Sequence, residues 1–404
     1  MVLFKHVKCI NSNLNDKLMT REIFFIGNSN NEIARIAYEL SKSIDNPINL
    51  ILIQKDTLND PTCLPYYTEL KQSIKIRDFR FEFRELFKFV KLICYVNFKI
   101  PKNSIIVMNS FAPGMVLRRN SHKIFVSTGT DITTYANWKW AQHMNLGISI
   151  FRSIIVFLQR SNIKQSIVIV HPEISRDPTY NNIFEKLCNH NQIKLSFQFS
   201  QLQDFSLTQN ANSIDAPIRF LIGCRLDDGL EYSQSTRTDF NDKNPYAIYE
   251  AVSSFDPKYP VEIFYIRKGK WVSKFDKLRP LSPLISLKGL EEMPYSEFIQ
   301  TMQSADIVID SIGPSIPGRV SIDALALNKF LIVNKTNFIF NDDFAEHIFH
   351  SENQKDLIDV FYKLMNSNIG KHREKCTHSI NFENIFDNPN FNYFITLITN
   401  LAKS

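Results

Sequence analysis

The chain has 404 residues, of which 44% are hydrophobic and 22% are charged, and its net charge is +6. This length exceeds what one hydrophobic core usually serves, so two domains of about 200 residues each are expected. The mild positive charge suits an anionic ligand or a membrane surface, and no Lys/Arg run is long enough to indicate a nucleic-acid partner.

The six cysteines are scattered without a CxxC pair. This spacing argues against a zinc site or a disulfide framework and favours a reducing compartment. The N-terminal segment MVLFKHVKCINSNLNDK lacks a long apolar region, and the most apolar run, residues 148–160, is short and contains Arg152. No transmembrane helix is therefore predicted. We expect a cytoplasmic protein, with the inner face of the membrane as the alternative location.

The first half of the sequence alternates short apolar strands with helices. Residues 23–26 form a predicted buried strand, followed by a turn at Gly27 and an amphipathic helix with apolar positions between 33 and 40. The pattern then continues with strands at 48–56, 104–109, 123–129, 165–173 and 193–199, and with helices at 83–96, up to about 165, and at 181–188. Such alternation predicts a parallel α/β sheet.

Residues 205–216, FSLTQNANSIDA, are polar and aperiodic, which is typical of an interdomain linker. A second α/β series follows, with strands at 218–225, 261–269, 284–290, 306–310 and 329–335, and helices at 245–255, 295–305, 320–328, 356–367 and 391–404. The predicted fold is therefore two doubly wound domains, residues 1–204 and 217–404, that face each other across a cleft. The last helix can pack back on the N-terminal domain.

In open α/β sheets, ligands bind beyond the carboxyl ends of the strands. Asp310 ends one predicted strand and is followed by a loop rich in Gly and Pro, then by a helix. If Asp323 lies in the first turn of that helix, the backbone N–H groups of Gly318, Arg319, Val320 and Ser321 form an anion site at its N-terminus. Ser321 can cap the helix, and Asp323 can accept hydrogen bonds from ribose hydroxyls. The alternative is that Ser321 and Asp323 are merely favourable capping and first-turn residues.

Two cations flank the first βα loop of the second half. Arg225 lies just past a strand and Lys243 just before the next helix. Together they can hold a diphosphate, because a guanidinium offers a planar fork of donors and an ammonium a point charge. The alternative is a pair of solvated loop cations. In the first half, Asp131 in STGTDITTYANWKW can face the cleft or can cap the next helix.

Taken together, the segments IGCR, DKNPYAIYEAV and ADIVIDSIGPSIPGRVSIDALALNKFLIV resemble the nucleotide-binding domain of GT-B glycosyltransferases, particularly the retaining enzymes of family four. The resemblance implies that Arg225 and Lys243 are the diphosphate-binding pair and that Gly318 is the loop glycine. It also matches Asp323 to the ribose-binding acid and Asp310 to the aspartate that ends the strand.

The first half extends the resemblance. The segment IGNSNNEIARIAYELSK, which contains Gly27, is similar to the first β-loop-α of the family, and VSTGTDITTYA, which contains Asp131, is similar to its GtD segment. Three positions depart from the pattern. Asp323 replaces a Glu, Ser315 occupies the place of the other acid of the pair, and Thr128 replaces a histidine.

The resemblance implies a metal-independent, retaining transferase that needs no cofactor and that moves a sugar from a nucleotide-sugar to a glycan or glycolipid acceptor in bacterial surface polysaccharide synthesis. Asp131, Arg225 and Lys243 are the expected catalytic residues. Two alternatives remain open: a catalytically inactive GT-B paralogue that binds or scaffolds, and a sugar-nucleotide epimerase. A nicotinamide dehydrogenase is disfavoured because IGNSNNEIA contains no GxGxxG.

Residues 77–99 interleave Arg and Lys with Phe. A basic and aromatic helix of this composition can lie on an anionic membrane. The alternative is that the Phe residues pack in the core while the charges are solvated.

Overall fold

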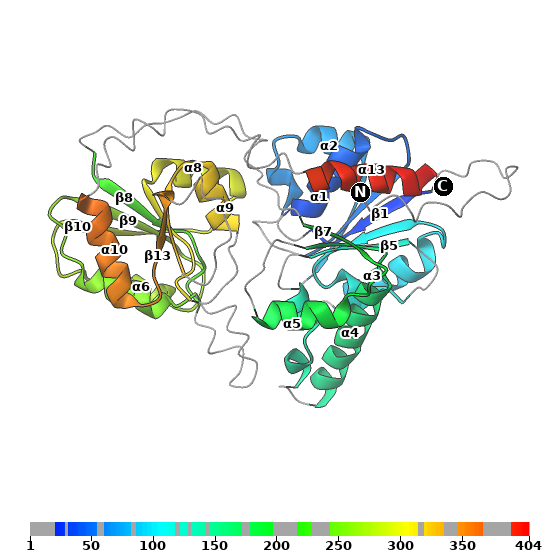
Figure 1. The fold of residues 1–404 in the computed structure, drawn as a ribbon, viewed down its shortest axis with the longest axis horizontal. Helices are drawn as coiled ribbons and strands as arrows, with labels where there is room; N and C mark the ends of the chain where they lie inside the picture. The colour runs from blue at the N-terminus through cyan, green and yellow to red at the C-terminus, as the bar shows by residue number, and fades with distance from the viewer. Residues whose placement is uncertain are drawn as a thin grey trace, which may run out of the picture.

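The computed structural model describes residues 21–28, 31–54, 60–81, 86–117, 122–127, 131–142, 146–171, 178–196, 216–227, 243–313, 319–334, 346–366 and 389–403. The predicted linker, residues 205–216, lies outside these ranges except for its last residue. Figure 1 shows the two sheets in separate halves of the molecule.

Within the described ranges, the first half contains a parallel sheet in the order β3-β2-β1-β4-β5-β6-β7. Its strands are β1 (Ile23–Ile26), β2 (Ile48–Gln54), β3 (Lys75–Phe81), β4 (Ile105–Met108), β5 (His122–Val126), β6 (Val168–His171) and β7 (Ile193–Ser196). The strand order reverses between β1 and β4, which pair in parallel. This reversal is the topological switch point at which open α/β sheets bind ligands.

Helices cover both faces of this sheet because successive side chains of each strand point to opposite sides. One face packs against α1 (Glu32–Ser41), α2 (Tyr67–Ser73) and the C-terminal helix α13 (Pro389–Lys403). The other packs against α3 (Leu86–Cys94), the π-helical turn η4 (Tyr95–Lys99), α4 (Leu146–Gln165) and α5 (Pro178–Leu187). Figure 1 shows the same two layers, with α13 beside α1 and α4 beside α5.

The return of the chain to the first half is fixed by contacts of α13. Phe394, Ile398 and Ala402 are buried in the core of the first sheet. At the ends of the helix, Arg21 Nη1 donates to the carbonyl of Leu401 at 3.3 Å, and Asn390 Nδ2 donates to the carbonyl of Ser196 at 2.9 Å. The last helix therefore belongs structurally to the first half, although it follows the second half in sequence.

Within the second half, the described strands form a parallel sheet in the order β10-β9-β8-β11-β12-β13. The strands are β8 (Ile218–Ile222), β9 (Val261–Ile266), β10 (Ile285–Leu290), β11 (Ile307–Ile309), β12 (Phe330–Val333) and β13 (Ile348–His350). One face packs against α6 (Pro245–Ser254), α7 (Val272–Phe275) and α10 (Gln354–Asn366), and the other against α8 (Tyr295–Ser304) and α9 (Arg319–Ala326). The predicted fold class, two doubly wound α/β units, is confirmed.

The predicted basic helix over residues 77–99 is wrong in its first part. Residues Lys75–Phe81 form β3, the edge strand beside β2, and α3 begins only at Leu86. Arg80 in this strand pairs with Asp78 and Asp60. Charged side chains are common on edge strands because they block pairing with another chain. The sequence analysis also did not assign α2, α7 or β13.

None of the helices in the described ranges combines the length and the apolar character needed to span a membrane.

Candidate functional site

The carboxyl edge of the second sheet begins where β8 ends. Gly223 follows the strand directly, and a Cβ atom placed on it would lie 2.7 Å from Val320 Cγ1, so only glycine lets α9 approach this closely. Cys224 comes next and is buried. Burial raises the pKa of the Cys224 thiol to about 12, with a further increase from the charge of Asp310 and an opposing effect from Lys243. These effects place Asp310 and Lys243 near the end of β8.

Asp227 joins the two predicted phosphate-binding cations. Its Oδ2 pairs with Arg225 Nε at 2.7 Å, and its backbone carbonyl accepts a hydrogen bond from Lys243 N at 3.2 Å. Its Oδ1 also accepts from Lys270 N at 2.9 Å. Asp227 therefore links Arg225, which follows β8, to Lys243, which precedes α6. Asp227 was not among the predicted site residues, although it stands two residues after Arg225.

Lys243 is positioned by the start of α6. Asn244 adopts a left-handed conformation with φ of 47°, its side chain accepts a hydrogen bond from Ala247 N at 3.2 Å, and Pro245 takes the first helical position. Asn and Pro at these places fix the entry of the helix. The carbonyl of Lys243 accepts from Ile312 N at 3.4 Å, which ties this residue to the loop after β11.

Asp310 stands at the end of β11, beside the end of β8, and is only 3% exposed. Its Oδ2 accepts a hydrogen bond from Ser321 Oγ. The loop that follows Asp310 is braced by Asn334, whose backbone N donates to the carbonyl of Ser311 at 2.9 Å and whose Nδ2 donates to that of Ile312 at 2.6 Å. The carboxylate is therefore held in a fixed orientation at the switch point of the second sheet, where the strand order reverses between β8 and β11.

The helix α9 begins at Arg319, so Ser321 and Asp323 lie inside it rather than at its cap. The expectation that Ser321 caps this helix is wrong, since its hydroxyl donates to Asp310 instead. Asp323 is fully buried and accepts a hydrogen bond from the Tyr295 hydroxyl at 2.6 Å. Gly318 and the side chain of Arg319 lie outside the described residues. The ribose-binding role of Asp323 stays a prediction.

The edge of the first sheet has a different chemistry. Gly27 ends β1 with φ of +131°, and a Cβ atom placed on it would lie 1.8 Å from Asn109 Oδ1. Asn109 lies just past β4, and its Oδ1 accepts from Asn28 N at 3.1 Å. Asn28 Nδ2 in turn donates to Asn31 Oδ1 at 2.7 Å. Gly27 is therefore required for the close packing of the β1 and β4 ends. The sequence analysis did not identify these asparagines.

Asp131 stands a few residues after β5, at the first position of the π-helical turn η6 (Asp131–Tyr135). It is fully buried, and its Oδ1 accepts from Ser127 Oγ at 2.9 Å and from Ile132 N at 3.0 Å. The carboxylate is thus hydrogen-bonded within the protein at the start of this turn. Its catalytic role stays a prediction, and Thr128 lies outside the described residues.

The structure brings Arg225, Lys243, Asp310 and Ser321 together at the switch point of the second sheet, whereas Gly27 and Asp131 belong to the first sheet. Ser315 lies outside the described residues. Among the residues that the structure describes, no cluster of His, Cys, Asp or Glu is arranged to hold a metal ion.

No protein-family model and no curated protein matches the sequence. Several solved structures match over nearly the whole chain, and two of them follow. Sucrose-phosphate synthase from Thermosynechococcus elongatus has a TM-score of 0.59 and 13% identity, and the match covers 95% of this chain and 100% of that one. A putative UDP-N-acetylglucosamine 2-epimerase from Listeria monocytogenes has a TM-score of 0.50 and 13% identity, covering 90% and 92%. The likeness confirms the GT-B-type fold of two Rossmann-like domains.

Proposed function

We propose that the protein is a glycosyltransferase that moves a sugar from a nucleotide-sugar donor to an acceptor. The observation that carries this proposal is the pair of cations, Arg225 and Lys243, joined through Asp227 at the switch point of the second sheet. Open α/β sheets bind nucleotides at such points, beyond the carboxyl ends of their strands. The first βα loop of this sheet thus presents two positive charges where a diphosphate would lie.

The chemistry of this site is electrostatic. When the bond between sugar and nucleotide breaks, negative charge develops on the leaving diphosphate, and nearby cations stabilise it most strongly where water is excluded. A guanidinium has five N–H donors, so the pairing of Arg225 through Nε leaves further donors for phosphate oxygens. Asp227 orients the guanidinium without contacting the donor. This arrangement supports a metal-independent reaction without a cofactor.

The finer features of the reaction follow from the family resemblance. We propose that the transfer retains anomeric configuration, as in the enzymes of family four, and that the acceptor is a glycan or glycolipid of a bacterial surface polysaccharide. The second half would hold the donor through Asp310, the α9 N-terminus and Asp323, and the first half would hold the acceptor. The protein would work in the cytoplasm, at the inner face of the membrane.

A thermal-shift screen against UDP, GDP, CMP, ADP and their common sugar conjugates tests the proposal. We expect one nucleoside diphosphate to raise the melting temperature, because a ligand that binds only the folded state stabilises it by mass action. Arg225→Ala and Lys243→Ala should each remove most of this shift. The matched controls are Arg279→Ala and Lys277→Ala, which remove exposed cations of the same half and should keep it. A complete lack of stabilisation would contradict the proposal.

A non-catalytic paralogue that only binds is the second candidate. It is favoured by the burial of Asp131 and Asp323, which are both 0% exposed and hydrogen-bonded within the protein. Both candidates predict nucleotide binding, so the decisive readout is turnover of the sugar conjugate that stabilises the protein. Release of free nucleoside diphosphate or transfer to an acceptor identifies the transferase. Stabilisation without turnover identifies the binding paralogue.

A further inference from the structure

The helix α4 has an apolar stripe on its outward side. Leu146, Ile150, Ile154 and Phe157 are between 53% and 78% exposed. At about 100° per residue these positions fall within an arc of about 80°. A surface helix normally has polar side chains at such positions. The stripe extends over three turns and therefore needs an explanation other than the packing of this chain.

From Ile155 to Ile163 the opposite side of α4 is packed in the protein, which fixes the outward direction of the stripe. The buried residues of the helix are Ile155, Val156, Gln159, Asn162 and Ile163. Their positions on the helical wheel centre opposite the stripe. Asn162 Nδ2 donates to the carbonyls of Pro113 and Val116 at 2.8 and 2.6 Å, which anchors this side to the chain that follows β4.

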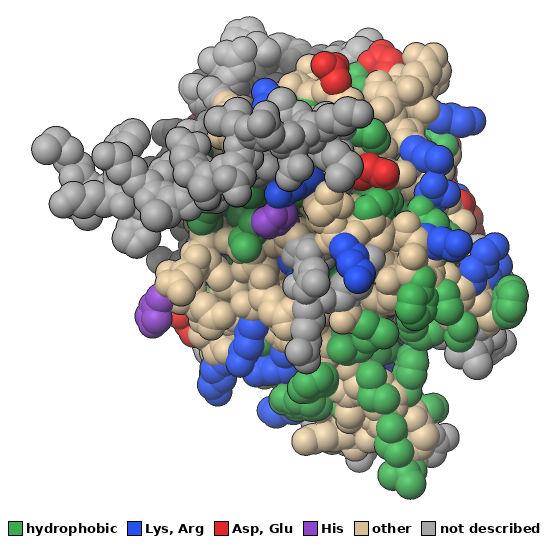
Figure 2. Space-filling view, turned by 90° about the vertical axis from the view of Figure 1, so that its right-hand side faces the viewer, with side chains coloured by type: hydrophobic (Ala, Val, Ile, Leu, Met, Phe, Trp, Pro, Cys, Tyr) green, Lys and Arg blue, Asp and Glu red, His purple; other side chains and the backbone are tan. Residues whose placement is uncertain are grey.

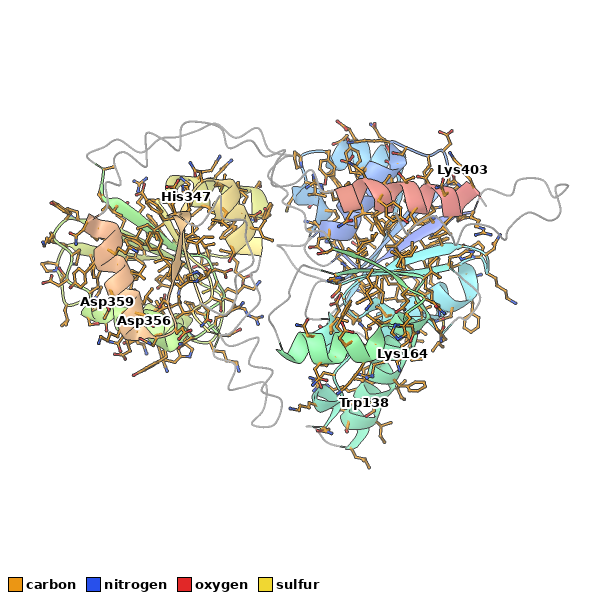
Figure 3. The ribbon with its side chains drawn as sticks, in the orientation of Figure 1. Trp138, Lys164, His347, Asp356, Asp359 and Lys403 are labelled. Carbon is orange, nitrogen blue, oxygen red and sulfur yellow. The ribbon has the colours of Figure 1, made fainter. Side chains whose placement is uncertain are left out.

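The helix α3 and the turn η4 add further exposed apolar side chains. Phe87 and Phe98 are 81% and 79% exposed. Phe89 of α3 packs its ring against Phe151 of α4 with ring centroids 5.6 Å apart, so the two helices are neighbours. Trp138, which Figure 3 labels at the lower tip of this half, is also exposed. We refer to the outward surface of α3, η4 and the first three turns of α4 as the α3–α4 face. Figure 2 shows its hydrophobic side chains at the lower right.

The sequence that contains this face is strongly basic. Residues 86–172 contain eleven Lys and Arg but a single acidic residue, Asp131, which is fully buried. Six of the lysines are exposed: Lys88, Lys91, Lys99, Lys102, Lys139 and Lys164. The whole chain is nearly balanced, with 47 basic and 41 acidic residues. The positive charge is thus concentrated on the part of the chain that carries the exposed apolar side chains.

We propose that the α3–α4 face docks on an anionic lipid bilayer. Exposed Phe, Leu and Ile can enter the boundary between headgroups and acyl chains, while surrounding lysines attract anionic headgroups. Long lysine side chains suit this role because their stems lie along apolar surface while the ammonium reaches the headgroups. The face shares residues 86–99 with the predicted segment 77–99 and adds α4. It does not include β3, where Arg80 is already paired with Asp60 and Asp78.

The charge pattern also argues against a second copy of the chain as the occupant. A two-fold symmetric interface brings the same surface patch of both subunits together. The exposed lysines of the α3–α4 face would then oppose one another, and like charges across an interface are unfavourable. An anionic bilayer supplies the opposite charge.

The buried side of α4 reaches the candidate acceptor side of the first sheet. Gln159 Nε2 donates to the carbonyls of Ser110 and Asp131 at 2.8 and 3.4 Å. The outward side of α4 thus belongs to the docking face, and its inward side contacts the carboxyl edge of the first sheet. A lipid-linked acceptor would suit this placement. The docking inference itself does not depend on the proposed transferase activity.

Vesicle flotation of the full chain tests the inference. We expect strong binding to vesicles of phosphatidylcholine mixed with phosphatidylglycerol, at least tenfold weaker binding to phosphatidylcholine alone, and release by salt. Ile150→Ser/Ile154→Ser should weaken binding at least tenfold. Lys91→Gln/Lys99→Gln should weaken it by about fivefold per lysine. All four residues are exposed, so circular dichroism of these variants should match the wild type.

Control variants carry changes of the same kind in the second half. Leu281→Ser removes an 80% exposed apolar side chain, and Lys258→Gln/Lys277→Gln removes two exposed lysines. Both controls should bind vesicles as the wild type does. The inference is overturned if the protein binds neither vesicle, if it binds both equally, or if the controls lose binding as much as the variants. It is also overturned if light scattering finds a dimer that Ile150→Ser/Ile154→Ser converts to a monomer.

Discussion

The switch points of the two sheets have the same topology but opposite chemistry. At the first switch point, the segments that follow β1 and β4 are joined by hydrogen bonds of neutral amide side chains. These belong to Asn28, Asn31 and Asn109, which are at most 3% exposed. At the second, the corresponding loops carry charges, and the Arg225 side chain is 39% exposed. Figure 1 shows the two sheets side by side in the molecule.

This difference indicates how the two edges are used. Buried amides that bond to one another and to the backbone fix the loop geometry, as do other satisfied buried polar groups. The partly exposed guanidinium of Arg225, which pairs with Asp227 through Nε, keeps donors that a phosphate can use. If the protein binds a nucleotide-sugar as proposed above, the second edge is therefore better suited than the first to hold its anionic diphosphate.

The largest expected loss of stability comes from substitution of the glycines at the carboxyl edges of the two sheets, Gly27 and Gly223. Gly27→Ala should lower the free energy of unfolding by about 3 kcal/mol or more, because φ is +131° and the new Cβ would lie 1.8 Å from Asn109 Oδ1. Gly223→Ala should cost about 1 to 2 kcal/mol, since its Cβ would meet only the Val320 side chain at 2.7 Å. Urea unfolding of both variants measures the difference.

Second substitutions separate the two causes. Gly223→Ala/Val320→Ala relieves the side-chain overlap and should restore part of the loss. Gly27→Ala/Asn109→Ala should restore little, because the positive φ remains unfavourable for alanine. Two results would show that backbone conformation does not distinguish the two edges. One is an equal loss of stability in Gly27→Ala and Gly223→Ala, and the other is full restoration of Gly27→Ala by Asn109→Ala.

Most of the fold could be predicted from the sequence because parallel strands buried on both faces are runs of apolar residues. Ile23–Ile26 and Ile307–Ile309 are of this kind. The edge strand β3 was missed for the same reason, since Lys75, Arg77 and Arg80 interrupt its apolar pattern. Strand β13 is only three residues long and carries no such run.

The sequence predicted those residues of the candidate site that can be recognised from their place next to a strand or a helix. Arg225 and Lys243 were found because each borders a βα loop. Their link through Asp227, and the bond between Tyr295 and Asp323, depend on tertiary packing that leaves no local pattern. Asp323 illustrates the limit, because its burial between two helices is invisible in an otherwise ordinary helical sequence.

A pH measurement sharpens the contrast at the second edge. Burial, with a contribution from Asp310, raises the pKa of the Cys224 thiol to about 12, whereas an unfolded thiol has a pKa of about 8.5. Above the lower value the unfolded chain loses a proton that the folded chain keeps, so stability falls as pH rises. At pH 10 this loss is about 2 kcal/mol. Urea unfolding at pH 8 and pH 10 should therefore show a smaller decrease for Cys224→Ala. If the wild type and Cys224→Ala lose the same stability between pH 8 and pH 10, the Cys224 thiol is exposed to solvent and not buried.

The smallest expected effect concerns Tyr295, whose hydroxyl donates to the buried Asp323. Tyr295→Phe keeps the ring but removes one donor from a buried carboxylate, which should lower the free energy of unfolding by about 1.5 kcal/mol. Tyr259→Phe, at a 59% exposed position, is the matched control and should change little. Nucleotide affinity separates two roles of Asp323. If its carboxylate binds ribose, Tyr295→Phe should also weaken the binding of the stabilising nucleotide several-fold, because the acceptor geometry relaxes. If Asp323 only joins α8 to α9, stability should fall while affinity stays at the wild-type value, and the second edge would then recognise its ligand through the cations alone.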